Sequence, residues 1–239
     1  MGDWPTTRVE PKSNPLLLGL QAARVNLVPA LIIQTIMFAL VAGFYWHPPT
    51  KAAMESLAAI KTTYGYFFSM TLAILGGAIL PEIFVIGFFQ RWKIHAVNFA
   101  NLRFTIVYWA FDGLFVDALY RTLGNVVGNN ANPGTVATKV LIDQFIINPL
   151  IFVPISLICY EWKHRNYDFK AMSDVFTWGY VKAKAIPTLV TSWCAWIPLL
   201  TAIYALPSPL QIPMFALALT IWVMLFTYIT QAGKAHESP

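Results

Sequence analysis

The chain has 239 residues, of which 57% are hydrophobic and only 11% are charged, and its mean hydropathy is +0.58. Soluble domains carry about 25% charged residues, so this composition excludes an ordinary soluble domain and predicts a membrane protein. The net charge is +5, and the basic residues are scattered between the apolar runs. This distribution is typical of membrane-protein loops and argues against nucleic acid as a partner.

Six runs approach the roughly 20 apolar residues that a helix needs to cross a bilayer. We predict an all-α fold, a polytopic membrane helix bundle with about six transmembrane helices. The bundle is expected to form a single domain over residues 24–232, between an N-terminal tail (1–23) and a C-terminal tail (233–239). In chain order, the predicted spans are residues 27–46, 66–89, 99–120, 144–160, 185–206 and 210–230.

The connections between the spans differ in composition. The uncharged "LPSPL" between the last two spans predicts a tight helical hairpin, because proline cannot continue a helix. The Gly/Asn-rich "GNVVGNNANPGTV" predicts an irregular surface loop. Residues 161–184 mix aromatic and basic side chains and predict a short amphipathic helix in the membrane interface, near the end of that loop.

Basic residues provide a check on the number of spans, because Lys and Arg accumulate on the side from which helices insert. With six spans, eleven of the 16 basic residues fall on one side and Arg103 lies within a span. The four on the opposite side are Lys51, Lys61, Arg121 and Lys139. This split predicts that both termini lie on the insertion side.

Charged residues inside the predicted spans are candidates for function, because each costs roughly 2.5 to 3.5 kcal/mol in hydrocarbon. They are Glu82, Arg103, Asp112 and Asp117. Asp117 and Arg121 stand four residues apart and can meet on one helical face. One interpretation is a polar path lined by Glu82 and Asp112, with Arg103 as a further candidate. The other is that the charges pair, with Arg103 or with neighbouring helices, and lock the packing.

Prolines and small residues predict how the helices pack. Four prolines lie inside predicted spans: Pro81, Pro149, Pro154 and Pro198. Each removes a backbone donor and frees a carbonyl that must find a partner within the protein. Ala73 and Gly77 stand four apart, a spacing that predicts close approach of a second helix.

Patterns typical of enzymes are missing from the sequence. The four histidines lie in different loops without a Cys or carboxylate at metal-ligand spacing. Nucleotide-binding and hydrolase motifs are absent, and no Lys lies deep in a span where it could form a Schiff base. Cys159 and Cys194 lie within apolar runs, where a thiol behaves as a small hydrophobe. We therefore expect no enzymatic activity, no metal and no cofactor.

The stretch "KVLIDQFIINPLIFVPI", residues 139–155, places an acid and an amide at the start of an apolar run. Asp143 at a helix start would accept backbone N–H groups and complement the helix dipole. The residues themselves therefore predict a helix cap with no further role.

The same stretch also carries a resemblance. Lys139, Asp143 and Gln144 match the K-x-x-x-D-Q segment of the Mpv-seventeen and twenty-two-kilodalton peroxisomal membrane protein family. "FDGLFVDALYRTLG" is similar to the family's G-P-x-x-H-x-W-Y-x-x-L segment. "WCAWIPLLTAIYALPSPLQIP" resembles its closing W-P-x-x-Q-x-x-N-F-x-x-V-P-x-x-x-R signature, through three anchor residues: Trp196, Pro198 and Pro207. The resemblance covers residues 66–231, and the first span is an addition.

This resemblance implies a non-enzymatic integral organelle-membrane protein from a family proposed to form passive small-solute channels. It favours the mitochondrial inner membrane, with a peroxisomal or plastid membrane as the alternative. The Gln, Asn and Arg of the closing signature and the family's Gly-Asp pair are not reproduced here, and a pore lining needs polar groups. The second interpretation is therefore a structural accessory subunit of a larger complex in an energy-transducing membrane. The expected partners are membrane lipids and other membrane subunits or further copies of the chain.

Overall fold

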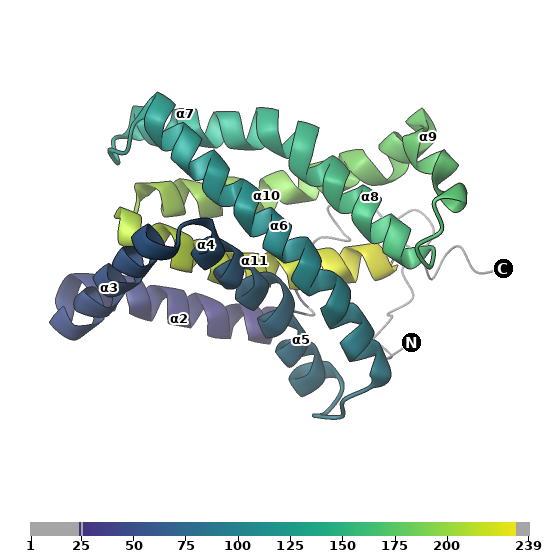
Figure 1. Ribbon diagram of the computed structural model, residues 1–239, viewed down its shortest axis with the longest axis horizontal. Helices are drawn as coiled ribbons and strands as arrows, with labels where there is room; N and C mark the ends of the chain where they lie inside the picture. The colour runs from purple at the N-terminus through teal and green to yellow at the C-terminus, as the bar shows by residue number, and fades with distance from the viewer. Residues whose placement is uncertain (1–23, 25, 233–239) are drawn as a thin grey trace. The chain divides into compact units, whose positions relative to one another are not determined.

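The computed structural model describes residue 24 and residues 26–232, with side chains up to residue 226 (Figure 1). The predicted tails, 1–23 and 233–239, lie outside the described residues. Every regular element in the described part is a helix, which confirms the all-α prediction.

Five described segments are long and apolar enough to cross a membrane, and they make this chain an integral membrane protein. They are Leu27–Trp46, Tyr66–Phe89, Pro133–His164, Trp178–Ala205 and Ser208–Phe226. Five of the six predicted spans fall on these segments. The remaining one, 99–120, lies within α6 (Ala96–Val127), which is long enough at 32 residues but is not among the five. The side of the membrane on which each connection lies stays a prediction.

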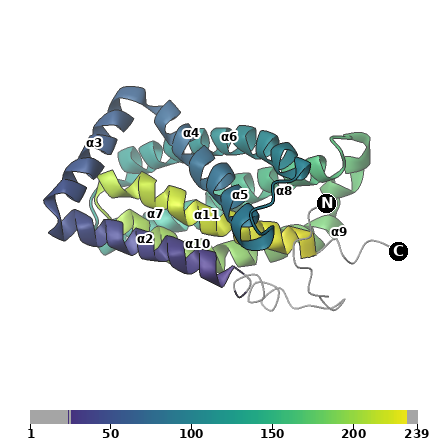
Figure 2. The same ribbon diagram turned by 90° about the horizontal axis from the view of Figure 1, so that it is seen from below.

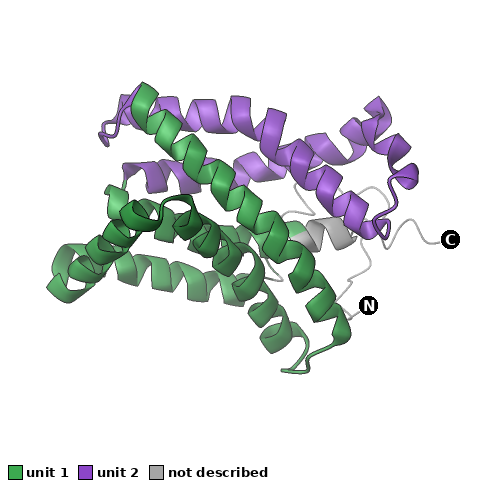
Figure 3. Ribbon diagram, in the orientation of Figure 1, with its two compact units in different colours: residues 1–126, 206–239 green, residues 127–205 purple. Residues whose placement is uncertain are grey.

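The chain divides into two compact units, and each is described by itself (Figure 3). Unit 1 comprises residues 1–126 and 206–239, and unit 2 comprises residues 127–205. The expectation of a single domain over residues 24–232 stays a prediction.

Unit 1 is built around its last helix, α11 (Ser208–Ala232), which contacts most of the other helices of the unit. Those partners are α2 (Leu27–Trp46), α3 (Pro48–Tyr64), α4 (Tyr66–Ile74), the π-helical turn η1 (Leu75–Ile79) and α5 (Leu80–Phe84). A second π-helical turn, η2 (Val85–Phe89), completes the segment that begins with α4. Figures 1 and 2 both show α11 running alongside α2. Leu210, Met214 and Leu219 of α11 are at most 1% exposed, so this helix supplies much of the core.

Helix α3 lies in the connection between the first two spans, where no helix was predicted. Pro48 and Pro49 suit its first turn, where backbone N–H groups have no intrahelical acceptor. The alanine-rich sequence that follows has high helix propensity. The segment was missed because it is too short and too charged to match the pattern of a membrane span.

Unit 2 is a pair of long helical segments whose connection carries a short 3-10 helix. The first segment joins α7 (Pro133–Ile142), the π-helical stretch η3 (Asp143–Phe152) and α8 (Val153–His164). The second joins α9 (Trp178–Tyr180), the π-helical turn η5 (Val181–Ala185) and α10 (Ile186–Ala205). Between them lies η4 (Lys170–Phe176). Helix α10 packs against both α7 and η3.

The first helical segment of unit 2 overturns the cap prediction for Asp143. The segment begins at Pro133, after Asn132, whose side chain accepts the backbone N–H of Thr135 at 2.8 Å. Asp143 lies inside the segment, well beyond its first turn, where backbone N–H groups already have intrahelical partners. The Gly/Asn-rich loop is correspondingly shorter than predicted, because its last residues form the first turn of α7.

The other connections also depart from the predictions in detail. A short amphipathic helix was predicted near the end of residues 161–184; the residues there are helical but open a long segment, and a separate 3-10 helix, η4, lies in the middle of the loop. Residues from Trp178 onward belong to the second long segment of unit 2. The helix break predicted at "LPSPL" is confirmed, because α10 ends at Ala205 and α11 begins at Ser208.

Candidate functional site: polar groups within the helical units

Pro149 frees a backbone carbonyl in unit 2 that a tryptophan satisfies. In η3 a backbone N–H bonds to the carbonyl five residues earlier, as Val153 does to Asn148. Pro149 has no N–H, so in this register the carbonyl of Gln144 loses its donor. The indole Nε1–H of Trp193, from α10, donates to that carbonyl at 2.7 Å.

The same arrangement occurs in unit 1 around Pro81. The N–H of Leu80 bonds to the carbonyl of Leu75, again five residues earlier, so Pro81 leaves the carbonyl of Gly76 without a donor. The hydroxyl of Thr220 on α11 donates to it at 2.8 Å. A β-carbon at Gly76 would overlap the carbonyl of Ala216, so only glycine permits this approach. The prediction that proline-freed carbonyls find partners is thus confirmed at Pro81 and Pro149.

Asp143 belongs to a buried chain of hydrogen bonds in unit 2. It is 4% exposed, and its two oxygens accept from the Tyr204 hydroxyl at 2.7 Å and from the Gln144 amide at 2.8 Å. The amide nitrogen of Asn148 lies 3.0 Å from both the Gln144 side-chain oxygen and the Ser192 hydroxyl. These five residues, which we call the buried network, join η3 to α10 by side-chain hydrogen bonds.

The family-motif residues partly gather at this network. Lys139 is one turn before Asp143 and 5% exposed, and its ammonium lies 5.6 Å from the ring centre of Tyr204. Trp196 is buried on α10, whereas Pro198 on the same helix is exposed. Pro207 lies between α10 and α11, outside unit 2.

Sequence reasoning missed four residues that complete these interactions in unit 2: Asn148, Ser192, Trp193 and Tyr204. The spacing of Gln144 and Asn148, four apart in an apolar run, was the available signal for a polar face. The residues on α10 carried none, because a single Ser or Tyr in a span is ordinary.

In unit 1, three of the four predicted intramembrane charges fall into two groups. The first, which we call the charge cluster, consists of Lys61, Asp117 and Arg121. Asp117 is 0% exposed, and its two oxygens lie 3.0 Å from the Lys61 ammonium and 3.1 Å from the Arg121 guanidinium. The predicted meeting of Asp117 and Arg121 on one face is therefore confirmed. Lys61 was missed because α3 was not predicted.

The second group is a polar stripe along α6. Asn98, Asn101, Thr105 and Asp112 are spaced by three, four and seven residues, which places them on one helical face. Glu82, from α5, joins this stripe at its beginning, because its carboxylate accepts from the Asn98 amide at 2.5 Å. Asn98 is buried, and the other three residues are half-buried.

Asp112 and Arg103 stand apart from these pairings. Asp112 makes no hydrogen bond or ion pair with another described residue. Arg103 lies on a different face of α6, is exposed, and likewise forms no ion pair within the described part of the chain. The sequence suggested that the carboxylates could pair with Arg103, and no such pair forms among the described residues.

Outside the spans, Arg165 links α8 to the connection between the two helical segments of unit 2 by hydrogen bonds. Its guanidinium donates to Glu161 at 2.9 Å and to Asp174 at 2.9 Å, and also to the carbonyl of Ala171. The hydrogen bond from Arg165 holds the pKa of Asp174 below its ordinary value, and the pKa of Arg165 is raised in turn. Met172, within the same connection, is 3% exposed.

Within the described residues, no group of three or more His, Cys, Asp and Glu is arranged to hold a metal ion. Comparison of the chain with protein-family models, curated proteins and solved structures found no match.

Proposed function

We propose that this integral membrane protein is a non-enzymatic, passive permeation protein for small solutes, and that the polar stripe of α6 lines part of the route. The observation that carries the proposal is the contrast between α6 and the five strongly apolar segments. A long helix with polar side chains on one face is unfavourable in lipid and is typical of a helix that faces water or protein.

The dimensions of the stripe fit this role. From Asn98 to Asp112 it covers 14 residues, or about 21 Å of helix, whereas the hydrocarbon core of a bilayer is about 30 Å thick. Asp112, at the far end, is half-buried and without a described partner. Placing its carboxylate in lipid costs roughly 2.5 to 3.5 kcal/mol, and contact with water along a route would lower that cost.

The buried network of unit 2 has a different role in this proposal. Each polar atom of its Asp143 carboxylate already has a donor within the unit. A closed network of this kind holds two helices in register and leaves little hydrogen-bonding capacity for a passing solute. We assign it to packing of the helical pair and assign permeation to the stripe.

The proposed location follows from the resemblance stated above. Lys139, Asp143 and Gln144, which carry that resemblance, lie together in unit 2. On this basis we propose an organelle membrane, with the mitochondrial inner membrane first and a peroxisomal or plastid membrane as the alternative. Fluorescence localisation of the tagged full-length chain tests this assignment, and a plasma-membrane signal would contradict it.

Solute flux tests the permeation proposal. Proteoliposomes containing the full-length chain should swell in glycerol faster than protein-free vesicles. Asp112→Leu should lower that rate severalfold, because an apolar side chain interrupts the stripe. Glu55→Leu is the matched control, since Glu55 is an exposed carboxylate on α3 whose ion pair is an exposed one with Lys51.

Two results would contradict the assignment. One is no swelling above the protein-free rate. The other is an Asp112→Leu variant that melts like the parent and conducts like it. If Asp112→Leu does not fold, Asp112→Asn takes its place, with potassium flux as the measurement, because the amide keeps the shape and removes the charge.

A second candidate function, an accessory subunit, is favoured by the surface of α2. Only 17% of the most apolar stretch of α2 is buried within the chain, whereas 67% of the corresponding stretch of α11 is buried. Leu31, Ile36 and Phe38 are among its exposed side chains, and other membrane subunits could cover them as well as lipid does. Extraction in a gentle detergent followed by native sizing tests this. A monomer or small homo-oligomer contradicts the subunit, and a large hetero-complex supports it.

A further inference from the structure

The charge cluster leaves one positive charge uncompensated. The single carboxylate of Asp117 is shared by two cations, Lys61 and Arg121. The carboxylate is fully buried, whereas the Lys61 side chain is 27% exposed and that of Arg121 is 44% exposed. An ammonium has three donors and a guanidinium five, so most of their donors are not used by Asp117.

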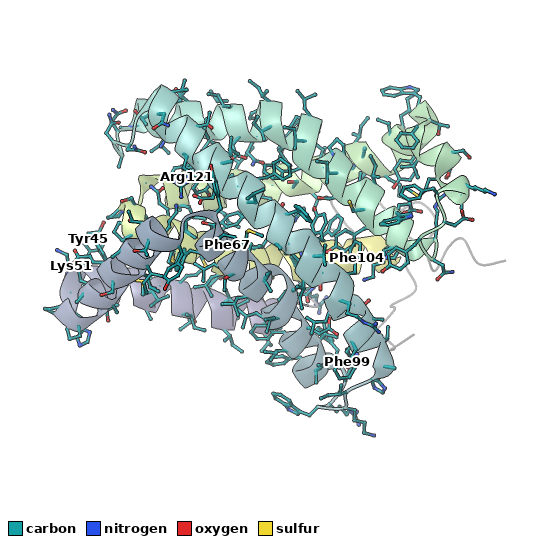
Figure 4. The ribbon with its side chains drawn as sticks, in the orientation of Figure 1. Tyr45, Lys51, Phe67, Phe99, Phe104 and Arg121 are labelled. Carbon is teal, nitrogen blue, oxygen red and sulfur yellow. The ribbon has the colours of Figure 1, made fainter. Side chains whose placement is uncertain are left out.

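This cluster lies at an end of a membrane-length segment. Tyr66 is the first residue of the segment Tyr66–Phe89, and the Arg121 guanidinium lies 4.8 Å from its ring centre. Further along, Gly77 packs on the ring of Trp109, so α4 and α6 run antiparallel and the late residues of α6 lie beside the start of α4. Figure 4 shows Arg121 at that end of α6.

The neighbouring aromatic residues agree with a position at headgroup depth. Tyr64 is 62% exposed and Tyr66 is 42% exposed, and tyrosines are enriched where membrane meets water. Lys61 stands one turn before Tyr64 at the end of α3. The two cations are therefore placed where anionic groups of a membrane surface are found.

We propose that the charge cluster binds an anionic phosphate group at the membrane surface, held between Lys61 and Arg121. The group is that of a lipid headgroup or of a free phosphate ester. A guanidinium fork matches phosphate oxygens with two parallel hydrogen bonds, and an ammonium adds a point charge. Asp117 neutralises one of the two positive charges and occupies a donor of each cation, so it competes with the phosphate for them.

A purely structural cluster and a phosphate site respond oppositely to loss of the carboxylate. In a structural cluster, Asp117→Asn weakens packing and gives no gain in binding. In a phosphate site, the same change releases the donors of both cations and strengthens anion binding. Loss of either cation should weaken binding about fivefold, which corresponds to about 1 kcal/mol for one basic residue at an anionic surface.

The test is a titration of the full-length protein in neutral detergent with phosphatidylglycerol, with bound lipid counted by native mass spectrometry. Lys61→Gln and Arg121→Gln should each lower the apparent affinity about fivefold, and Asp117→Asn should raise it. Lys51→Gln is the matched control, because Lys51 lies on the same helix, is 54% exposed and pairs with Glu55. It should leave the affinity unchanged.

A second arm of the experiment identifies the source of the phosphate. If millimolar inorganic phosphate displaces the lipid, the site accepts free phosphate groups; if it does not, the lipid headgroup is the ligand. The proposal is overturned if Lys61→Gln and Arg121→Gln bind as tightly as Lys51→Gln. It is also overturned if a folded Asp117→Asn variant binds less than the parent. Should Asp117→Asn not fold, the comparison of Lys61→Gln with Lys51→Gln decides alone.

Discussion

The hydroxyl of Thr220 tests whether proline-freed carbonyls govern the stability of unit 1. Thr220 is fully buried, and its hydroxyl lies 2.8 Å from the Gly76 carbonyl and 3.2 Å from the Ala216 carbonyl of its own helix. Thr220→Val keeps the shape of the side chain and removes only the donor. Because Pro81 cannot supply an N–H, the Gly76 carbonyl would then be buried without a partner.

The expected loss can be estimated from the burial of that carbonyl. An unsatisfied buried acceptor costs about 1 to 3 kcal/mol, while side-chain hydrogen bonds in membrane proteins average about 0.6 kcal/mol. We expect Thr220→Val to lower the free energy of unfolding by about 1 to 2 kcal/mol. Thr201→Val should change it by less than about 0.5 kcal/mol, because Thr201 is exposed and bonds only to Ile197 of its own helix.

A double-mutant cycle with Pro81→Ala isolates the mechanism. Alanine restores an N–H that can serve the Gly76 carbonyl, so Thr220→Val should cost about 1 kcal/mol less in the Pro81→Ala background. Unfolding in mixed micelles, followed by tryptophan fluorescence, measures all four proteins. An equal cost in both backgrounds, or a cost no greater than that of Thr201→Val, would refute the reasoning.

Three further outcomes are expected. Gly76→Ala should destabilise the protein by about 1 to 3 kcal/mol in the same unfolding assay, because its β-carbon meets the backbone of Ala216 and backbone cannot give way; wild-type stability would contradict this. Trp193→Phe should cost about 1 to 2 kcal/mol by leaving a carbonyl of η3 without its donor, and an unchanged midpoint would argue against that role. The lowered pKa of Asp174 means that its contribution is complete above the unfolded value of 3.8 and is lost as pH falls through the lower folded value. Protection of η4 against hydrogen exchange, corrected for intrinsic rates, should therefore be constant from pH 8 to about 4 and fall below that, whereas Arg165→Gln should reduce it already at pH 7.

The membrane spans could be predicted closely from local composition. Residues 27–46 and 66–89 agree in both bounds with apolar segments of the structure. The fourth span was predicted to begin at residue 144, because a search for apolar residues starts only after the last charged residue. In the structure it begins at residue 133. The helix itself begins at the Asn132 cap and runs through Lys139 and Asp143, whose polar groups find partners in the folded unit.

In the candidate sites, pairings within one helix could be predicted from the sequence, whereas pairings between helices could not. A spacing of four residues was enough to place Asp117 beside Arg121, because both lie on one helix. Nothing in the sequence could place Lys61 on the same carboxylate, since Lys61 and Asp117 are 56 positions apart and their pairing depends on how α3 packs. The long-range bond from Tyr204 to Asp143 is another such pairing, and without it the acid looks like a simple cap.

Composition by itself determined that this chain is helical and crosses a membrane, because the cost of exposing backbone and charge to hydrocarbon is incurred segment by segment along the chain. Only the tertiary structure decided which polar groups become hydrogen-bond or ion-pair partners. Hydrogen bonds and ion pairs act over about 3 Å in space, and residues on different helices are brought to that distance only by packing.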